Sequence, residues 1–304
     1  MVDTDREPKG TALNPLIDYN SPAALRAFLE THGLGMQKKF GQNFLIQSEA
    51  RKKLVAALEV NPGASLWEVG PGLGSMTVEL LDSGAQVTVF EIDRGFSNQL
   101  RELFGSQQNF KIVEGDVLKT WPQEYGLHKP DYFFGNLPYN IAAVLLGDLI
   151  EGNALFQRLV VTVQKEVAQR MIALPGTEHY SSFSVLCSSV YRIKPLMTLK
   201  GASFFPPPNV DSQAVTMELR EDLADHPFPP LFYPLVRGLF SSRRKTVRNN
   251  LISLLASRGV ERAADRALGA LNAAGIEPNQ RAETLDLEDF FKLAQVLEET
   301  HAHS

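Results

Sequence analysis

The stretch FGNLPYNI, residues 134–141, places an amide, a proline and an aromatic ring where an apolar run ends. The side-chain oxygen of Asn136 and the main-chain carbonyl of Leu137 or Pro138 could both accept hydrogen bonds from one exocyclic amino group. Pro138 fixes φ and donates nothing, so it keeps the turn rigid. Tyr139 offers a flat face on which a base can stack. The pattern therefore indicates a pocket for a planar base that carries an amino group.

These residue types suit the N6 amine of adenine, whose lone pair is delocalised into the ring and makes it a poor nucleophile. Two acceptors on its two hydrogens favour a pyramidal nitrogen with the lone pair aimed at a methyl sulfonium. Positioning, more than a strong base, would then promote the reaction. The alternative is that residues 136–138 form only a structural turn.

A glycine turn precedes this stretch in the sequence EVGPGLGS, with glycines at positions 70, 72 and 74. Glycines allow a tight turn and let the backbone approach a ligand closely. The dinucleotide fingerprint G-x-G-x-x-G would require Gly or Ala at position 75, which is Ser75. The G-x-G-x-G spacing is instead typical of enzymes that use S-adenosylmethionine. Taken alone, the same pattern also fits a glycine turn in any doubly wound sheet.

Two acids at the ends of the next predicted strands strengthen the interpretation of a cofactor site. Glu91 ends VTVFE, 91 − 70 = 21 positions after Gly70, where an acid typically accepts hydrogen bonds from ribose hydroxyls. Asp93 competes for that role but could cap the following helix. Asp116 ends VEGD and could accept from an adenine amino group, or serve only as a helix cap or turn former. Ligands of open α/β sheets lie at these carboxyl ends.

The elements that would position these residues alternate between strand and helix from residue 65 to residue 220. This alternation predicts a mostly parallel sheet with helices on both faces. A Ser21-Pro22 start predicts one earlier helix. Residues 220–230, REDLADHPFPP, are polar and proline-rich, and the sequence beyond them has the pattern of helices. We therefore expect a boundary there.

Composition sets limits on the class of protein. The chain of 304 residues has 44% hydrophobic residues, a net charge of −5 and no apolar run long enough for a membrane span. Its polar N-terminus does not resemble a signal peptide, so we expect a cytoplasmic protein. The single cysteine, Cys187, lies in an apolar run and is interpreted as a packing residue. The histidines show no metal-like spacing.

Basic residues gather in two places although the whole chain is acidic. One group lies between positions 236 and 251 and the other between positions 38 and 53. By themselves they are best interpreted as two solvated helix faces, and a net negative charge argues mildly against nucleic-acid binding. The groups are Arg237, Arg243, Arg244, Lys245 and Arg248, and Lys38, Lys39, Arg51, Lys52 and Lys53.

Eight motifs occur in an order that resembles the small-subunit ribosomal RNA adenine N6,N6-dimethyltransferase family, which includes the kasugamycin-sensitivity dimethyltransferase. They are KKFGQNFL, EVGPGLGS, EID, EGD, GNLPYNI, VQKEVAQRM, FFPPPNVDS and RRKTVRNNL, and the resemblance covers roughly residues 36–292. It implies a Rossmann-like methyltransferase sheet with a small C-terminal helical domain. The expected domains are an N-terminal extension with one helix (1–35), the methyltransferase domain (36–220) and a helical RNA-binding domain (221–304).

The resemblance also implies roles for individual residues. Phe204 would stack on the side of the target adenine opposite Tyr139, while Asn136, Leu137, Pro138 and Tyr139 would form the catalytic pocket. The substrate would be two adjacent adenosines in the 3′-terminal hairpin loop of small-subunit rRNA, each methylated twice at N6. Loop adenines suit base extrusion because they are unpaired. S-adenosylmethionine would contact Asn43, Leu45, Gly70, Gly72, Glu91, Asp116 and Asn136.

The resemblance changes the interpretation of the basic residues. Lys38 and Lys39 would lie at the mouth of the site, and four cations of the helical domain would bind RNA phosphates. The expected partner is the assembling small ribosomal subunit, bound by a monomer that needs no metal or membrane. Three alternatives stay open: a large-subunit rRNA methyltransferase of the antibiotic-resistance type, an assembly factor with secondary catalysis, and a small-molecule methyltransferase. The four cations are Arg243, Arg244, Lys245 and Arg248.

Overall fold

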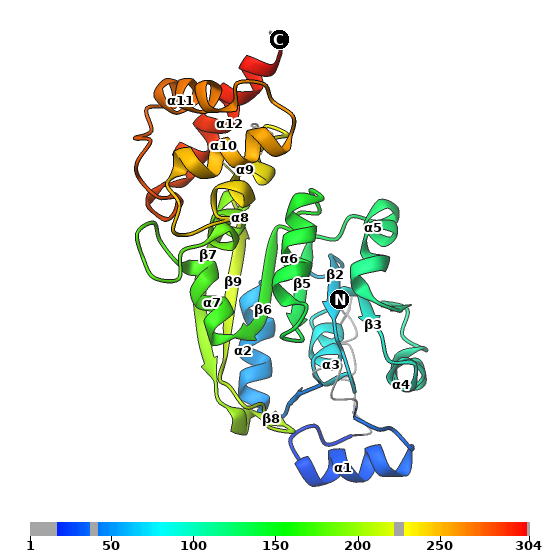
Figure 1. Ribbon diagram of the computed structural model, residues 1–304. Helices are drawn as coiled ribbons and strands as arrows, with labels where there is room; N and C mark the ends of the chain where they lie inside the picture. The colour runs from blue at the N-terminus through cyan, green and yellow to red at the C-terminus, as the bar shows by residue number, and fades with distance from the viewer. Residues whose placement is uncertain (1–16, 37–41, 222–227, 303–304) are drawn as a thin grey trace, which may run out of the picture. The chain divides into compact units, whose positions relative to one another are not determined.

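The computed structural model describes residues 17–36, 42–221 and 228–302 (Figure 1). The chain divides into two compact units. The first comprises the described residues up to Ala142, together with Phe156–Gln164 and Leu196–Thr216. The second comprises Ala143–Leu155, Lys165–Pro195 and the residues from Met217 onward. The expected boundary at residues 220–221 stays a prediction, because the second unit also takes in earlier segments.

A seven-stranded sheet has the order β4-β3-β2-β5-β6-β9-β7. Five neighbouring strands are parallel, as predicted, and β6, β9 and β7 form an antiparallel hairpin arrangement at one edge. The parallel strands read as near-continuous apolar runs because both faces of such a sheet are covered. The strands are β2 (Ser65–Val69), β3 (Gln86–Glu91), β4 (Phe110–Glu114), β5 (Tyr132–Asn136), β6 (Arg158–Gln164), β7 (Tyr191–Leu199) and β9 (Ser212–Leu219).

The strand register brings the ends of the parallel strands to one level. Val69 pairs with Phe90, Glu91 pairs with Glu114, and Asn136 pairs with Thr162. The acids and the amide singled out in the sequence therefore lie along one edge of the sheet, where ligands of this fold bind.

Strand β7 was not among the predicted elements. Its residues alternate poorly and several are exposed, and Pro195 argues against a central strand. The structure places β7 last in the sheet order, at an edge, where a proline and exposed charges are tolerated. A second, two-stranded sheet joins β1 (Phe44–Leu45) to β8 (Phe204–Phe205), with Leu45 opposite Phe204.

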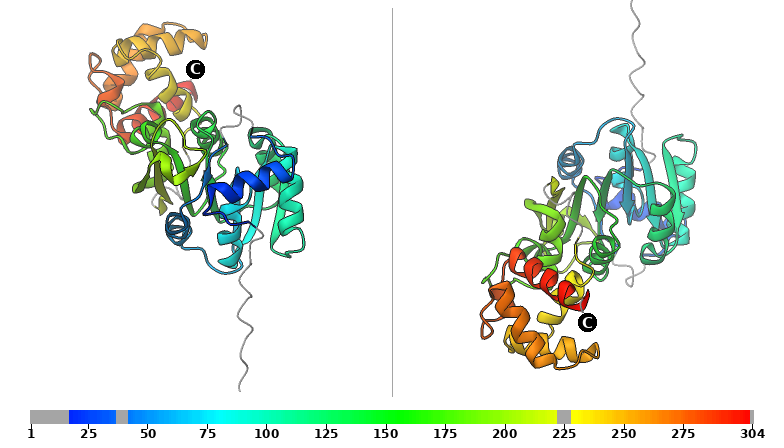
Figure 2. Two further views of the ribbon diagram at one scale, coloured as in Figure 1. Left: turned by 90° about the horizontal axis from the view of Figure 1, so that it is seen from below. Right: turned by 90° about the horizontal axis from the view of Figure 1, so that it is seen from above.

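Side chains cap the N-termini of three helices in the first unit, through Ser21, Asp93 and Asp116. Ser21 caps α1 (Pro22–Thr31) with its hydroxyl accepting from Ala24 N, as predicted from the Ser-Pro pair. Figure 2 shows α1 in front of the sheet when the molecule is seen from below, and Figure 1 shows it beneath the strands. The other helices are α2 (Ser48–Leu58), α3 (Ser75–Asp82), α4 (Arg94–Phe104) and α5 (Val117–Leu127), and α6 (Ala142–Glu151) begins in this unit.

The second unit has a hydrophobic core of its own. Helices α9 to α12 pack together and enclose fully buried side chains such as Phe232, Leu251 and Phe290. This helical region matches the predicted all-helical C-terminal part. Cys187 is completely buried, and burial raises the pKa of its thiol, which confirms it as a packing residue. The helices of this unit are α7 (Lys165–Ile172), α8 (Ser182–Val190), α9 (Phe232–Leu239), α10 (Val247–Ser257), α11 (Ala263–Ala274) and α12 (Leu287–Ala302).

Across residues 17–36, 42–221 and 228–302, no helix is long and apolar enough to cross a membrane.

Candidate cofactor and substrate site

A cavity of about 280 Å³ opens at the carboxyl ends of the parallel strands in the first unit. Its wall combines the glycine turn, the residues that follow β3, β4 and β5, and the segment that leads into β1. Of the predicted site residues it gathers Asn43, Gly70, Gly72, Glu91, Asp116, Asn136 and Pro138. It also gathers residues that the sequence did not indicate: Gln42, Phe44, Val69, Phe90, Ile92, Gly115, Val117, Leu118, Asn140 and Ile141.

The glycine turn needs its glycines for two different reasons. Gly70 has φ +74° and Gly72 has φ +56°, backbone conformations that residues with a Cβ rarely adopt. A Cβ on Gly72 would also lie 2.6 Å from the ring of Phe44, whereas one on Gly70 would have no neighbour closer than 3.8 Å. The turn thus brings bare backbone to the cavity wall and lets β1 pack close behind it.

Glu91 fastens the turn to the end of β3. Its Oε2 accepts from the N–H of Gly72 at 3.1 Å, and its Oε1 accepts from the N–H of Asp93 at 2.8 Å. The residue is only 4% exposed. Burial raises the pKa of its carboxyl to about 7, against the lowering effect of the two backbone N–H groups. Each carboxylate oxygen can accept a further hydrogen bond, so the two hydroxyls of a ribose fit this group.

Asp116 and Asp93 separate into two roles. Asp93 caps α4 by accepting from the N–H groups of Gly95 and Phe96 and does not line the cavity, which confirms its interpretation as a cap. Asp116 caps α5 through Oδ1, which accepts from Leu118 N at 3.1 Å, and also lines the cavity. Its cap interpretation and its site interpretation are therefore compatible. Its second carboxylate oxygen has no hydrogen bond to the described residues and suits an amino donor.

Asn136 has its amide orientation fixed by the segment before β1. Its Nδ2 donates to the carbonyl of Asn43 at 2.9 Å, so Oδ1 is the end that remains to accept. The carbonyl of Pro138 already accepts from the N–H groups of Ile141 and Ala142 at the start of α6. Within the described chain no hydrogen bond reaches the Leu137 carbonyl. These contacts favour the Leu137 carbonyl over that of Pro138, and its role as an acceptor stays a prediction.

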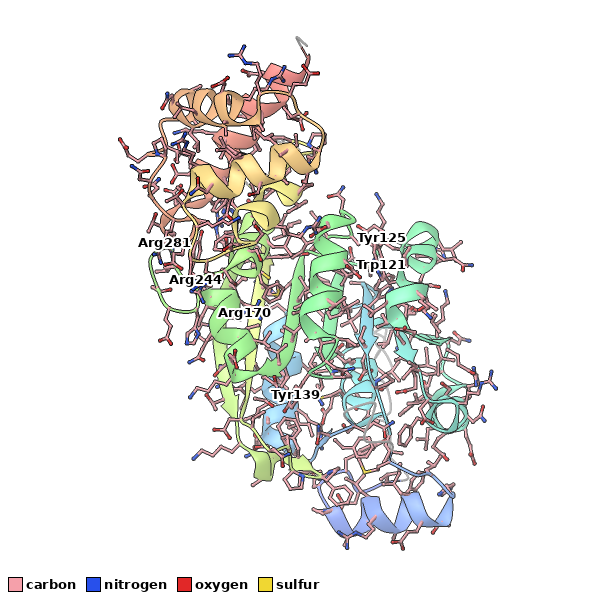
Figure 3. All side chains as sticks on the ribbon, viewed as in Figure 1. Trp121, Tyr125, Tyr139, Arg170, Arg244 and Arg281 are labelled. Atoms are coloured by element: carbon pink, nitrogen blue, oxygen red, sulfur yellow. The ribbon has the colours of Figure 1, made fainter. Side chains whose placement is uncertain are left out.

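Tyr139 is half-buried, and its hydroxyl forms a 2.8 Å hydrogen bond with the hydroxyl of Ser212 (Tyr139 is labelled in Figure 3). Ser212 is completely buried at the start of β9. Burial raises the pKa of Tyr139, so its hydroxyl is protonated at neutral pH. The ring is thus fixed at both ends: by the backbone after Pro138 and by Ser212.

The two predicted residues on the small sheet are buried. Leu45 is 2% exposed and does not line the cavity; its neighbour Phe44 does. Phe204 is 3% exposed and belongs to the hydrophobic core, whereas Phe205 is only partly buried. The stacking role of Phe204 stays a prediction, and it requires the ring to gain a free face. Lys38 and Lys39 lie outside the described residues.

A second buried acid escaped the sequence analysis. Glu68, in the middle of β2, is 1% exposed, and Thr77 donates its hydroxyl to Oε2 at 2.7 Å. Burial raises the pKa of its carboxyl to about 8. Glu68 does not line the cavity, and an acid inside an apolar strand has no sequence signal that separates a functional role from a structural one.

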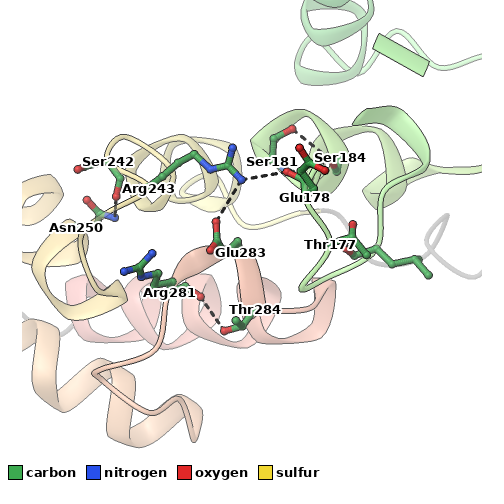
Figure 4. A network of polar contacts seen from close by, with 11 residues as sticks. Thr177, Glu178, Ser181, Ser184, Ser242, Arg243, Asn250, Arg281, Glu283 and Thr284 are labelled. Atoms are coloured by element: carbon green, nitrogen blue, oxygen red, sulfur yellow. Dashed lines mark hydrogen bonds and ion pairs between the residues drawn. The ribbon is translucent and has the colours of Figure 1, made fainter. Parts of the chain in front are cut away.

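The residues Arg243–Arg248, here called the basic segment, run from the loop after α9 into the first turn of α10 in the second unit. Arg243 donates to the carbonyl of Glu178 at 3.1 Å and pairs with Glu283 at 3.3 Å (Figure 4). Arg244, Lys245 and Arg248 are exposed. The predicted four cations therefore include one that also holds the second unit together.

Arg51 corrects the interpretation of the other basic group as a solvated face. The side chain is buried, bonds to Asn20 Oδ1 and the Leu45 carbonyl, and lies 3.6 Å from Glu79. Lys52 and Lys53 are the exposed members of that helix.

A parallel sheet with a glycine turn, strand-end acids and an amide that faces a cavity defines a Rossmann-like methyltransferase. The structure is similar to a dimethyladenosine transferase from Plasmodium falciparum, with a TM-score of 0.72 and 26% identity over 84% of this chain and 97% of that one. It also shares the fold of the 23S rRNA methyltransferase ErmE, with a TM-score of 0.59 and 22% identity over 84% of this chain and 99% of that one.

Sequence relatives narrow the class to one family. The family model described as ribosomal RNA adenine dimethylase matches residues 33–297. The chain is 46% identical over 283 residues to the ribosomal RNA small subunit methyltransferase A of Treponema denticola, which covers 92% of this chain and 96% of that protein. It is 35% identical to the protein of the same name from Borreliella afzelii, over 94% of this chain and 97% of that protein. The chain belongs to the ribosomal RNA adenine dimethylase family and is an S-adenosylmethionine-dependent methyltransferase.

Proposed function

We propose that the protein transfers methyl groups to N6 of two adjacent adenosines in the 3′-terminal hairpin loop of small-subunit rRNA, giving N6,N6-dimethyladenosines during ribosome biogenesis. The observation that carries the proposal is the Asn136 amide. Asn43 holds its Nδ2, and the turn occupies the Pro138 carbonyl, so Asn136 Oδ1 and the Leu137 carbonyl are left as a pair of acceptors. Two acceptors and no charged base match an amino group with two hydrogens.

Some residues of the cavity would bind the cofactor, and others would bind the target base. Glu91 would accept from the ribose hydroxyls and Asp116 from the adenine amino group of the cofactor, while Gly70 and Gly72 let backbone approach it. The bound cofactor supplies a methyl group on a positively charged sulfur. Phe44 and Ile92 add apolar wall to this part of the cavity, which is typical of sites for small molecules.

The target amine would be held by position more than by basicity. Asn136 Oδ1 and the Leu137 carbonyl would each accept one N6 hydrogen, which favours a pyramidal nitrogen with its lone pair free for the methyl group. Neither oxygen is a strong base, so the proton would leave to solvent after the new N–C bond forms. Tyr139 would stack on the base, with its ring held by Ser212. In a second cycle the monomethylated amine would keep one hydrogen, held by one of the two oxygens, and transfer of a second methyl group would give the dimethylated product on each adenosine.

The rRNA partner would be bound by the second unit. Arg244, Lys245 and Arg248 are exposed and suit phosphate contacts, which are electrostatic and independent of base identity. A chain with a net charge of −5 would bind free RNA weakly, so we expect an assembling small subunit in the cytoplasm as the partner and a monomer as the active form. Relatives named for the small subunit, at up to 46% identity, support this choice over the large subunit.

The test is to incubate the purified protein and S-adenosylmethionine with small subunits from a strain that lacks this modification. Mass spectrometry of the rRNA should show two adjacent dimethyladenosines in the 3′-terminal hairpin. Large subunits from the same strain serve as the matched substrate control and should stay unmodified. Methylation of the large-subunit rRNA alone would overturn the proposal in favour of the antibiotic-resistance type of activity.

A further inference from the structure

The segment of residues 17–36 lies mostly ahead of the part that the family model matches, which begins at residue 33. It is nevertheless built into the first unit. Ile17 is 2% exposed, Tyr19 is 5% exposed, and Leu25 and Leu29 of α1 are buried in the same hydrophobic cluster as the strands. A segment that was only an appendage would not bury a tyrosine.

Tyr19 touches the glycine turn itself. Its hydroxyl donates to the carbonyl of Leu73 at 2.8 Å, in a buried hydrogen bond between residues 54 positions apart. Leu73 is completely buried and follows Gly72, which lines the cavity and is held by Glu91. The turn is therefore held at two successive residues: Glu91 accepts from the N–H of Gly72, and Tyr19 donates to the carbonyl of the following residue.

Arg51 ties the same segment to the other wall of the cavity. Its Nη2 donates to Asn20 Oδ1 at 2.9 Å, and its Nη1 donates to the carbonyl of Leu45 at 3.1 Å. Leu45 lies two positions after Asn43, whose carbonyl holds the Asn136 amide. Through adjacent residues the segment thus reaches both the glycine turn and β1.

Contacts of α1 extend to the proline-rich loop. The guanidinium of Arg26 lies 5.7 Å from the centre of the Phe205 ring, close enough for a cation–π contact. Phe205 follows Phe204, the predicted stacking residue. One short N-terminal segment therefore contacts the glycine turn, β1 and β8.

We propose that residues 17–36 are a positioning element of the cofactor site, with Tyr19 as its central residue. The inference rests on the proposed placement of the cofactor in the strand-end cavity. A turn that contains Gly70, Gly72 and Gly74, all at positive φ, has many other conformations open to it. Fixing the Leu73 carbonyl reduces those alternatives before the cofactor arrives, so less conformational freedom is lost on binding.

The chain offers a matched control for testing Tyr19. Tyr180 in the second unit is also buried, and its hydroxyl donates to a leucine carbonyl, that of Leu285, at 2.9 Å. Tyr19→Phe and Tyr180→Phe each remove one hydroxyl from the same kind of hydrogen bond. Both variants should lose similar stability, but only Tyr19→Phe removes a contact to the glycine turn.

The measurement is titration calorimetry of the full-length protein with S-adenosylmethionine. Tyr19→Phe should raise the Kd about three- to tenfold, because binding must then order a turn that this hydrogen bond no longer holds, while Tyr180→Phe should leave it unchanged. With the cofactor saturating, kcat of Tyr19→Phe should stay close to that of the wild type, so that the defect lies in KM for the cofactor. Asn20→Ala, a change at an exposed residue, should give a smaller shift in the same direction.

Asp116→Ala separates the failure of this inference from the failure of the proposed site. If Asp116→Ala weakens cofactor binding and Tyr19→Phe matches Tyr180→Phe, the site stands and the positioning role is overturned. If Asp116→Ala leaves the Kd unchanged, the placement of the cofactor is overturned and the inference with it. A drop in melting temperature without a change in Kd for Tyr19→Phe would show a purely structural residue.

Discussion

The strand-end cavity and the basic segment differ in how their charged side chains are placed: buried and hydrogen-bonded in the first, exposed to solvent in the second. In the cavity, Glu91 is 4% exposed and both of its oxygens accept backbone N–H groups. In the basic segment, Arg244, Lys245 and Arg248 are exposed. A buried group with a hydrogen bond on each oxygen is held in one geometry and has a perturbed pKa, whereas an exposed cation has many conformations and is screened by salt.

This difference indicates in which region the loss of a single side-chain atom should affect function. The cavity must orient one small group, so each acceptor has a fixed place and no substitute. In the proposed function the basic segment attracts a polyanion, and its members would contribute in parallel. We therefore expect single substitutions to disable the cavity and only combined substitutions to disable the basic segment.

Asn136→Ala should have the largest effect, because it removes one of the two acceptors that we propose for the target amine. Loss of a single positioned hydrogen-bonding group at a reacting centre costs about 10²–10³-fold in rate. We expect methyl transfer in single-turnover assays to fall by that factor. Asn109→Ala is the matched control, since Asn109 also donates through Nδ2 to a carbonyl, that of Ala85, at 2.9 Å. Near-normal transfer by Asn136→Ala would contradict the account of the strand end.

The combined change Arg244→Ala, Lys245→Ala and Arg248→Ala should have the next largest effect. We expect affinity for small subunits to fall about 10–10²-fold and the salt dependence of binding to weaken by up to about three counterions. Arg243 is left in place because its bond to Glu283 supports the unit. Cofactor affinity should not change.

The control for the basic segment removes the same charge elsewhere in the second unit. Arg258, Arg262 and Lys292 again comprise two arginines and one lysine, all exposed. Replacing these three by Ala should leave subunit binding within about threefold of the wild type. Equal losses from both triple variants would mean that net charge, and not this segment, attracts the subunit.

Glu91 gives the cavity a pH dependence that the basic segment lacks. Burial raises its pKa to about 7, and a protonated carboxyl is a poorer acceptor for ribose hydroxyls. Cofactor Kd should therefore fall about tenfold between pH 6 and pH 8. The sign for stability is opposite: a raised carboxyl pKa favours the folded protein at low pH, and that contribution is lost as the pH rises through about 7.

Glu91→Gln isolates this titration from that of Glu68, whose pKa is raised to about 8. Calorimetry of the variant should show weaker binding that no longer varies between pH 6 and pH 7. A profile that keeps the full slope would assign the titration to another group.

The residues at the carboxyl ends of the parallel strands were predicted well from the sequence, and the reason is geometric. Parallel strands place their carboxyl ends at one edge, so Gly70, Glu91, Asp116 and Asn136 could be grouped before their contacts were known. Strands β2, β3 and β5 can be recognised as near-continuous apolar runs because both faces of the sheet are covered there.

Features that depend on contacts between distant residues could not be predicted. Arg51 resembles its exposed neighbours in sequence but is buried against Asn20 and Leu45. The choice of the Leu137 carbonyl depends on how α6 begins. Strand β7 tolerates its proline because it is an edge strand of the sheet. No local sequence pattern predicts which strand will be at an edge.

The smallest effect that the comparison predicts concerns the hydroxyl pair of Tyr139 and Ser212, which are 73 positions apart. Tyr139→Phe and Ser212→Ala should each lower kcat/KM for the small subunit about threefold, because a ring with one anchor loses orientation. The double variant should be no worse than either single one, since both remove the same bond. Ser181→Ala, which breaks a serine hydroxyl pair in the second unit, should leave kcat/KM unchanged. Cofactor Kd should stay constant throughout. Additive losses in the double variant would mean that Ser212 supports the packing of the core and does not orient the Tyr139 ring. The hydrogen bond between the two hydroxyls would then not be needed to position the base.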